Sequence, residues 1–216
     1  MLDLNERWCL VVGGGHVSVR KIGGLLAVGA HVLVVSPSLC DQLVQWRKDG
    51  KLSAIERNYQ TGDLYNPMGT PYQLVFAATD RREVNRQVVQ EAQALGIPVT
   101  SATDPDDGTF RLPAVLRRGD LTISVSTGGA SPMLTQHIRD QLANTYGDEY
   151  EQLIDFFAQF RQHVLRTIED ETERRRLFAS LIHSNLSDYL IEIRESRFEE
   201  RKRNLWLQCF GIEYGE

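Results

Sequence analysis

The stretch WCLVVGGGHVSVRK, at residues 8–21, decides the fold of the first part of the chain. Its apolar run Trp8–Val12 is typical of a buried strand, and Gly13, Gly14 and Gly15 follow at once, before apolar residues with helical spacing. This fits the pattern G-x-G-x-x-small, in which glycines allow a sharp reversal and let backbone amides approach a pyrophosphate. The partly positive N-terminus of the helix then faces the phosphates. The stretch predicts a dinucleotide-binding turn, with a tight turn that holds no ligand as the alternative.

We expect the cofactor to contact, besides the three glycines, the start of the first helix, the end of the second strand and the loop after the fourth strand: His16, Val17, Ser36, Pro37, Ala78 and Thr79. The acidic residue that often binds the ribose 2′-hydroxyl about 20 residues after the glycine turn is absent. Ser36 can hydrogen-bond a ribose hydroxyl but does not repel a 2′-phosphate, and no arginine immediately follows it. The pattern favours NAD over NADP without excluding NADP.

Apolar strands alternate with helices through the first half of the chain. We expect strands at residues 8–12, 31–35, 53–57, 74–78 and 97–101, with helices at 17–28, 39–48 and 83–95. Such alternation predicts an α/β fold with a parallel, Rossmann-like sheet covered on both faces.

The pattern changes after Pro113. Residues 121–127 alternate with period two, as in a half-exposed strand, and Ser131-Pro132 has the N-cap and N1 residues of a new helix. From residue 148 onward the spacing predicts only helices, among them 177–182 and 189–203, with an apolar stripe at Tyr150, Leu153, Ile154, Phe157, Phe160, Val164 and Leu165. We therefore divide the chain into a dinucleotide-binding domain at 1–113, a middle segment at 114–147 and a helical domain at 148–216.

Composition and charge narrow the class of protein. The net charge of −5 argues against a nucleic-acid partner, and the whole excess of acidic residues lies in residues 148–216. Cys9, Cys40 and Cys209 form no CxxC, and the histidines lack HxxH or HxxxH spacing, so no metal site is expected. No apolar run approaches the ~18 residues of a membrane span, and no secretory signal is visible. We expect a cytoplasmic protein without a membrane partner.

Four segments in register resemble the precorrin-2 dehydrogenase family, which includes the N-terminal part of bacterial siroheme synthases. They are GGGHVSVRK (13–21), FAATDRREVNRQV (76–88), the segment from Asp104-Pro105 to FRLPA (110–114), and LTISVSTGGASPML (121–134). Their order and spacing resemble the family across residues 7–145. The sequence departs from the family pattern at Ser101, where Asn is frequent, at Ser18, where Ala is common, and at Thr127, where some members carry Ser.

The resemblance implies an activity and an assembly. Members of this family oxidise precorrin-2 to sirohydrochlorin with NAD+ as hydride acceptor, on the way to siroheme, and some also insert iron. They are homodimers with a Rossmann domain, a small dimerisation segment and a helical C-terminal domain. We therefore expect NAD as cofactor, precorrin-2 as substrate and a homodimer formed through residues 114–147, and leave iron insertion open.

Asp104 is the candidate catalytic residue. It follows a predicted strand, at the carboxyl edge of the sheet where ligands of open α/β sheets bind, and it matches the aspartate that the resemblance implicates. Hydride loss from the substrate must be accompanied by proton loss, which a carboxylate base can accept. The interpretation is a general base or a substrate-orienting acid. The alternative is a turn aspartate before Pro105.

Candidates for binding the polycarboxylate substrate lie in several segments. The hydroxyls of Ser126 and Thr127 are candidates to hold a carboxylate or a pyrrole nitrogen, and Gly128 allows close approach of the backbone. Arg111 and Arg117 are candidates for acetate and propionate groups, because arginine binds carboxylates in bidentate fashion. The alternatives are a simple strand-to-helix turn and ordinary surface charges. Further candidates are Arg20 and Lys21 for anionic groups and Asn85 for bracing the loop at Thr79.

Two other functions compete with this enzyme. One is a non-catalytic NAD-sensing regulatory module, which has no need of the STGGASP segment at 126–132. The other is an oxidoreductase of a different family, for which a Tyr-x-x-x-Lys pair or a similar signature would be expected and is not found.

Overall fold

A five-stranded parallel sheet lies at the centre of the N-terminal unit, Met1–Arg111. The computed structural model describes residues 2–104, 106–183, 186–212 and 214, so Pro105 lies outside the described residues. The strand order is β3-β2-β1-β4-β5. From β1 the chain adds β2 and β3 on one side of the sheet and then β4 and β5 on the other, so the order of the strands switches between β1 and β4. The strands are β1 (Trp8–Val12), β2 (His31–Val35), β3 (Ser53–Ile55), β4 (Leu74–Ala77) and β5 (Val99–Ser101). Their all-parallel pairing confirms the predicted sheet.

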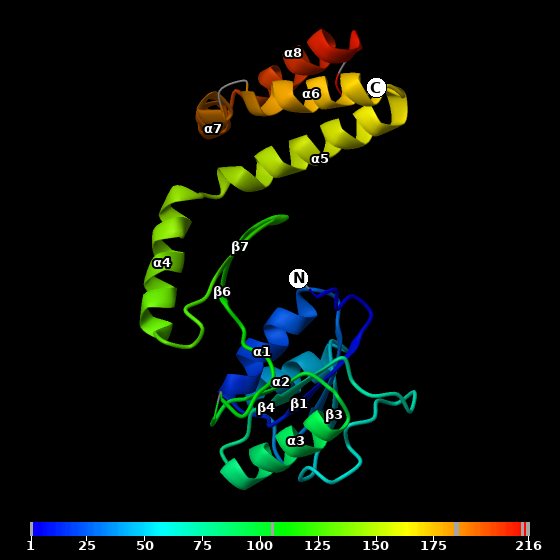
Figure 1. The fold of residues 1–216 in the computed structure, drawn as a ribbon, viewed down its shortest axis with the longest axis vertical. Helices are drawn as coiled ribbons and strands as arrows, with labels where there is room; N and C mark the ends of the chain where they lie inside the picture. Colours follow the sequence, from blue (N-terminus) through cyan, green and yellow to red (C-terminus); the bar gives the residue numbers. More distant parts are fainter. Residues whose placement is uncertain (1, 105, 184–185, 213, 215–216) are drawn as a thin grey trace. The chain divides into compact units, whose positions relative to one another are not determined.

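Three helices cover the two faces of this sheet: α1 (His16–Leu26), α2 (Asp41–Lys48) and α3 (Arg82–Ala94). Because successive side chains of a strand point to opposite faces, Cys9 and Val11 of β1 pack with α1 and α2, whereas Leu10 and Val12 pack with α3. Figure 1 shows α1 and α3 on opposite sides of the sheet. Burial from both faces explains why the sequences of β1, β2 and β4 are almost continuously apolar.

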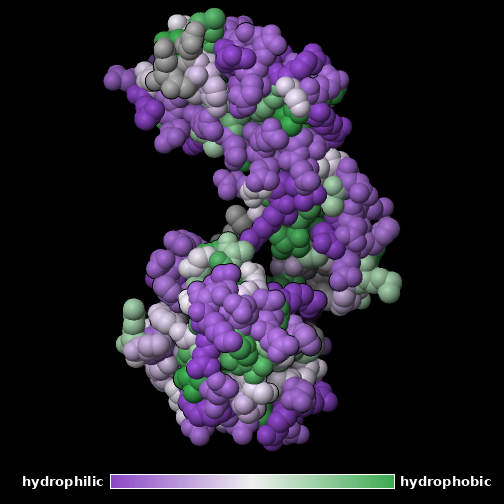
Figure 2. Space-filling model, turned by 180° about the vertical axis from the view of Figure 1, so that it is seen from behind, coloured by the Kyte–Doolittle hydropathy of each residue, from purple (hydrophilic) through white to green (hydrophobic). Residues whose placement is uncertain are grey.

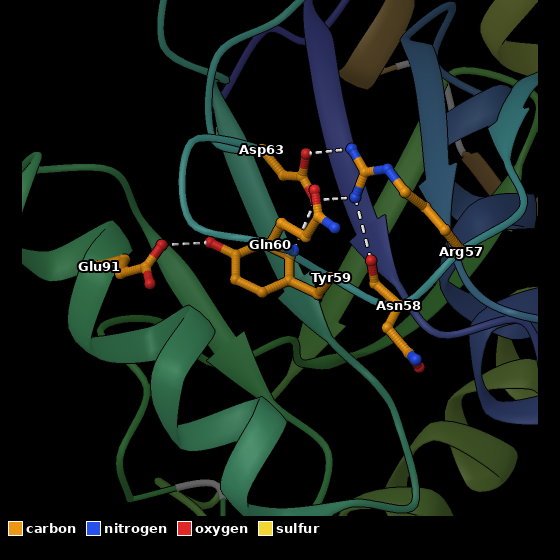
Figure 3. Close-up of polar contacts among 6 residues, drawn as sticks. All are labelled: Arg57, Asn58, Tyr59, Gln60, Asp63 and Glu91. Carbon is orange, nitrogen blue, oxygen red and sulfur yellow. Dashed lines mark hydrogen bonds and ion pairs between the residues drawn. The ribbon is translucent and has the colours of Figure 1, made fainter.

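The connection between β3 and β4 is fastened by polar contacts (Figure 3). The Arg57 guanidinium donates to both carboxylate oxygens of Asp63, at 2.7 and 2.6 Å. The Tyr59 hydroxyl donates to Glu91 of α3 at 2.7 Å, and burial together with this carboxylate raises the Tyr59 pKa. The long connection is therefore tied both to itself and to the helix that follows β4.

The second unit, Leu112–Glu216, contains a two-stranded antiparallel sheet and five helices among its described residues. The strands are β6 (Ala114–Arg118) and β7 (Leu121–Val125), and the helices are α4 (Pro132–Thr145), α5 (Glu149–Thr167), α6 (Glu171–His183), α7 (Leu186–Arg194) and α8 (Phe198–Phe210). Ser131 caps α4 as predicted, with its Oγ accepting from the Leu134 amide at 3.2 Å. Strand β6 was not predicted, and the predicted segments 114–147 and 148–216 both lie in this unit.

The helices of the second unit pack around an aromatic core that includes Phe156, Phe160 and Tyr189. The predicted stripe on α5 was wrong at two positions, because Leu165 is 43% exposed whereas the omitted Phe156 is 1% exposed. The predicted single helix at 189–203 was also wrong. The chain leaves α7 at Arg194 and re-enters a helix at Phe198, and Ser196 between them has φ 59°. This break lets Ile193 and Phe198 both reach the core.

Within the described ranges, no helix combines the length and the apolar character that a membrane span requires. The same residues contain no group of three or more His, Cys, Asp or Glu side chains that could hold a metal ion. The face shown in the space-filling view is mainly hydrophilic, with hydrophobic residues in scattered patches (Figure 2).

Candidate active site

The first two glycines of the turn after β1 are required by the protein itself. Gly13 has φ +121°, and a Cβ there would lie 2.3 Å from the carbonyl oxygen of Ala78. A Cβ on Gly14 would lie 2.0 Å from the carbonyl oxygen of Ser38. The turn therefore packs directly against the loops that follow β4 and β2, and any side chain at either position would push these loops away.

Gly15 is different, because no atom of the described residues lies within 4 Å of the position that its Cβ would occupy. It is the N-cap of α1, with φ −90° and no side-chain capping bond, and the first turn contains no acidic residue. His16 and Val17 are exposed beside it. The first amides of a helix have no acceptor within the helix and carry partial positive charge. An open, uncapped helix N-terminus beside a glycine that the fold does not require fits the approach of a pyrophosphate.

The loop after β2 also follows the predicted plan. Ser36 is 5% exposed, and its hydroxyl donates to the Ser38 carbonyl at 2.7 Å, while Pro37 is exposed. The hydroxyl proton is thus used within the loop, and the oxygen is left as the atom that can accept from a ribose hydroxyl. The contact of Ser36 and Pro37 with the cofactor stays a prediction.

A buried amide joins the loops after β4 and β5. Asn85 of α3 is 0% exposed, and its Oδ1 accepts from the Thr79 amide at 3.0 Å and the Thr79 hydroxyl at 2.7 Å. Its Nδ2 donates to the Thr79 carbonyl at 2.9 Å and to Thr103 Oγ1 at 3.1 Å. Thr103 in turn contacts Ser101 Oγ at 3.2 Å, and that oxygen accepts from the Asp104 amide at 3.2 Å. Hydrogen bonds therefore run from the expected cofactor loop to the candidate catalytic residue.

Asp104 itself is paired with an arginine that the sequence reasoning missed. Arg82, the first residue of α3, donates from Nη2 to Asp104 Oδ2 at 2.8 Å. This bond is the main cause that holds the Asp104 pKa below its usual value, with a smaller contribution from the charge of Arg86. One signal was present in the sequence. A cation in the first turn of a helix is disfavoured by the helix dipole, so Arg82 at this position suggests an interaction outside the helix.

Lys21 of α1 lines a small hollow at the carboxyl ends of β4 and β5, together with residues 76–78 and 100–102. Its side chain is half-buried, whereas the neighbouring Arg20 is exposed. Burial, followed by the charge of Arg20, lowers the Lys21 pKa, and no carboxylate contributes to the shift. Lys21 therefore presents a cation to this hollow, whereas the side chain of Arg20 is exposed.

The remaining substrate candidates have partners of their own. Thr127 Oγ1 accepts from the Ser131 amide at 3.1 Å and contacts Thr135 Oγ1 at 3.0 Å, while Ser126 Oγ accepts from the Gly128 amide at 3.2 Å. Gly128 has φ +63°. The segment thus has the strand-to-helix turn that was the alternative interpretation, although the Ser126 side chain is exposed.

The two candidate arginines are exposed. Arg111, at the end of the N-terminal unit, forms an ion pair with Asp106, and Arg117 lies on β6 of the second unit. Because Arg117 and residues 126–128 belong to a different unit from Asp104, their part in binding one substrate stays a prediction.

Two family models match the chain. Residues 1–114 match a family described as NAD(P)-binding, and residues 118–145 match one described as sirohaem biosynthesis protein central. The precorrin-2 dehydrogenase of Priestia megaterium is 32% identical over 195 residues, which cover 90% of this chain and 94% of that protein. A solved structure named SirC, precorrin-2 dehydrogenase, has a TM-score of 0.75 at 30% identity, covering 94% of this chain and 98% of the other.

Longer proteins match as well. The siroheme synthase of Nitrosospira multiformis is 34% identical over 191 residues, which cover 87% of this chain but 39% of that protein. The siroheme synthase of Gluconacetobacter diazotrophicus is 35% identical over 181 residues, 84% of this chain and 38% of that protein. The chain therefore spans about two fifths of the length of these siroheme synthases.

Proposed function

This chain belongs to the precorrin-2 dehydrogenase family, and we propose that it oxidises precorrin-2 to sirohydrochlorin with NAD+ as the hydride acceptor. One observation carries the proposal. The turn at Gly13 packs on the loop that contains Thr79, and Asn85 bonds this loop to the one that carries Asp104. A dinucleotide-binding turn and an ionised carboxylate therefore share one hydrogen-bonded edge of the sheet, as an oxidation that releases a hydride and a proton requires.

The reaction removes one hydride and one proton from precorrin-2. NAD+, held at the turn of Gly13, Gly14 and Gly15, would supply the acceptor for the hydride and its electron pair. Asp104 takes the proton as the bonding pair that held it stays in the macrocycle, and then passes the proton to solvent. The lowered pKa of Asp104 keeps it ionised, and so able to accept a proton, throughout the neutral range.

The residues around the turn fit a dinucleotide. The amides of His16 and Val17 at the start of α1 would hold the pyrophosphate in the space that Gly15 leaves open. Ser36 would accept from a ribose hydroxyl. Residues 36–40 contain no Lys or Arg to attract a 2′-phosphate, which supports NAD rather than NADP.

The substrate is a polycarboxylate and needs cations around it. Lys21 lines the small hollow at the carboxyl ends of β4 and β5 and would present its charge to a carboxylate near it. We extend the proposal to Arg111, Arg117, Ser126, Thr127 and Gly128 as further substrate contacts, on the strength of the family resemblance.

We also propose a homodimer that forms through residues 114–147. The exposed apolar side chains of Val115, Met133 and Leu134, which are 38%, 82% and 48% exposed, support this assignment. The three free cysteines fit the reducing cytoplasm. No observation favours iron insertion, and the proposal is confined to the dehydrogenase step.

The direct test is to mix the purified protein with anaerobically prepared precorrin-2 and NAD+. We expect sirohydrochlorin and NADH to appear in equal amounts. The visible absorbance measures sirohydrochlorin and the near-ultraviolet absorbance measures NADH. Tight binding of NAD+ without turnover would contradict the proposal and favour a non-catalytic NAD-sensing module.

A further inference from the structure

The ion pair between Arg82 and Asp104 joins two side chains with unequal surroundings. The Arg82 side chain is 64% exposed, whereas that of Asp104 is 28% exposed. The Asp104 amide is held by Ser101 Oγ, while Arg82 begins α3 and reaches across to the carboxylate. The guanidinium is therefore the partner that faces solvent and can move. Ion pairs of this exposure contribute little net stability, so a competing anion can replace one partner.

Helix α3 gains nothing from a cation at this position. Arg82 and Arg86 lie one turn apart at the start of the helix, where the dipole favours negative charge. The N-cap residue, Arg81, makes no side-chain capping bond. The charged groups that act on this pair are Arg86, which lowers the Asp104 pKa, and Asp107, which raises that of Arg82. The placement of Arg82 is thus explained by the carboxylate opposite it and not by the helix.

This pairing creates a conflict for a catalytic base. A carboxylate that accepts a bond from a guanidinium is ionised, but its affinity for a proton is reduced. Asp104 in its present surroundings is therefore ready to accept a proton but weak in doing so. A polycarboxylate substrate brings groups that compete for a guanidinium, because arginine binds carboxylates through two parallel hydrogen bonds.

We propose that a carboxylate of the substrate replaces Asp104 as the partner of Arg82, so that binding anchors the substrate and frees Asp104 to take its proton. The exchange forms one guanidinium–carboxylate pair as another opens, and charge is conserved. The Asp104 Oδ2 lone pair that accepted from Arg82 then accepts the proton that leaves with the hydride. This inference rests on the proposed oxidation of precorrin-2 and on Asp104 as its base.

The test compares Arg82→Gln with Arg81→Gln and Arg82→Lys. Arg81 is an exposed neighbour, so its replacement controls for loss of one positive charge. Lysine keeps the charge at position 82 but not the two-pronged geometry. The measurements are the precorrin-2 KM, kcat, the Kd for NAD+ and the pH dependence of kcat and kcat/KM, between pH 3 and 8, for each variant and for the parent protein.

The pH profiles carry the sharpest expectation. The acid limb of kcat/KM reports the free enzyme, in which Arg82 holds Asp104, whereas that of kcat reports the substrate complex. In the parent protein the limb of kcat should therefore lie at higher pH. In Arg82→Gln the acid limb of kcat/KM should move to higher pH, so that the difference in pH between the two limbs disappears. The precorrin-2 KM should increase on the order of tenfold, as expected for a lost charge-assisted bond. Arg82→Lys should recover part of this loss, and Arg81→Gln should match the parent.

Each other result has a distinct meaning. If the parent protein does not oxidise precorrin-2, the proposed function fails. If the parent is active and Arg82→Gln keeps the parental KM and the parental gap between the two limbs, the exchange is overturned. A fall in kcat with both of these unchanged also overturns it, since it shows a structural role. An unchanged Kd for NAD+ in Arg82→Gln establishes that the fold is intact, and Arg82→Lys supplies the same comparison if the glutamine variant is unstable.

Discussion

Replacement by alanine should change the stability of the protein very differently at two adjacent glycines, Gly14 and Gly15. A methyl group on Gly14 would lie 2.0 Å from a backbone oxygen, and backbone cannot give way as a flexible side chain can. Gly14→Ala should therefore destabilise the protein by about 1–3 kcal/mol or more, in the manner of an overpacked core. A methyl group on Gly15 meets no atom of the described residues within 4 Å. Gly15→Ala should change the free energy of unfolding by less than about 1 kcal/mol, because alanine loses only a modest N-cap preference and gains backbone rigidity.

Cofactor binding should separate the two variants further. If a pyrophosphate approaches the first turn of α1, the added methyl group of Gly15→Ala occupies its path. The Kd for NAD+ should then rise at least about tenfold, which corresponds to about 1.4 kcal/mol. Isothermal titration with NAD+ and urea unfolding of the same samples measure both quantities. A Gly15→Ala protein that binds NAD+ within twofold of the parent would refute the assignment of this helix N-terminus to the cofactor.

Three further substitutions test the interior of the N-terminal unit. Asn85→Ala should cost about 1–3 kcal/mol in urea unfolding, because it removes the hydrogen bonds that this buried amide makes to two loops. Ser18→Ala should be neutral or stabilising by up to about 1 kcal/mol, because the Ser18 hydroxyl is buried and has no hydrogen-bond partner among the described residues. A clear loss of stability would contradict this. Asp63→Asn tests pH dependence. Burial raises the Asp63 pKa but the bonds from Arg57 outweigh it, so its folded pKa lies below its unfolded value near 3.9. The stability that it contributes is present above that unfolded value and is lost as the pH falls through the folded pKa, so Asp63→Asn should flatten the acid arm of a plot of unfolding free energy against pH.

The parts of the fold that the sequence predicts best are those with the most uniform surroundings. Strands β1 and β2 have the predicted bounds, because burial on both faces makes almost every residue apolar and leaves a sharp edge at the glycine turn and at Ser36. Strand β6 was missed because only Leu116 of its five residues is buried. A strand that is paired on one side and exposed elsewhere has no apolar pattern to detect.

Helix breaks and ion pairs depend on distant contacts and are harder to predict. The residues between α7 and α8 have ordinary helical composition, and the break at Ser196 serves packing of Ile193 and Phe198 against helix α5. The pairing of Arg82 with Asp104 joins residues 22 positions apart, on a helix and on a loop after a strand. Sequence spacing identifies the helix and the loop but not the side chains that meet between them.

The candidate site also contains features that a local sequence pattern predicts and features that depend on distant contacts. The glycine turn and Asp104 could be proposed from the sequence because the turn has a pattern and Asp104 follows a strand at the carboxyl edge of the sheet, and their roles stay predictions. The bracing role predicted for Asn85 is borne out by its four hydrogen bonds to the two loops. The inward use of the Ser36 hydroxyl and the burial of Lys21 could not be read from the residues, since both depend on how α1 and the β2 loop pack.

The most direct test of the central claim is to measure turnover and NAD+ affinity together in Asp104→Asn, with Asp80→Asn as the control. Asp80 is an exposed carboxylate on the neighbouring loop, so its loss changes the charge near the site without removing the proposed base. We predict that Asp104→Asn binds NAD+ within twofold of the parent but oxidises precorrin-2 at least about a hundredfold more slowly, as expected for loss of a general base, while Asp80→Asn retains both properties. Parental turnover by Asp104→Asn would contradict the claim that this carboxylate takes the proton.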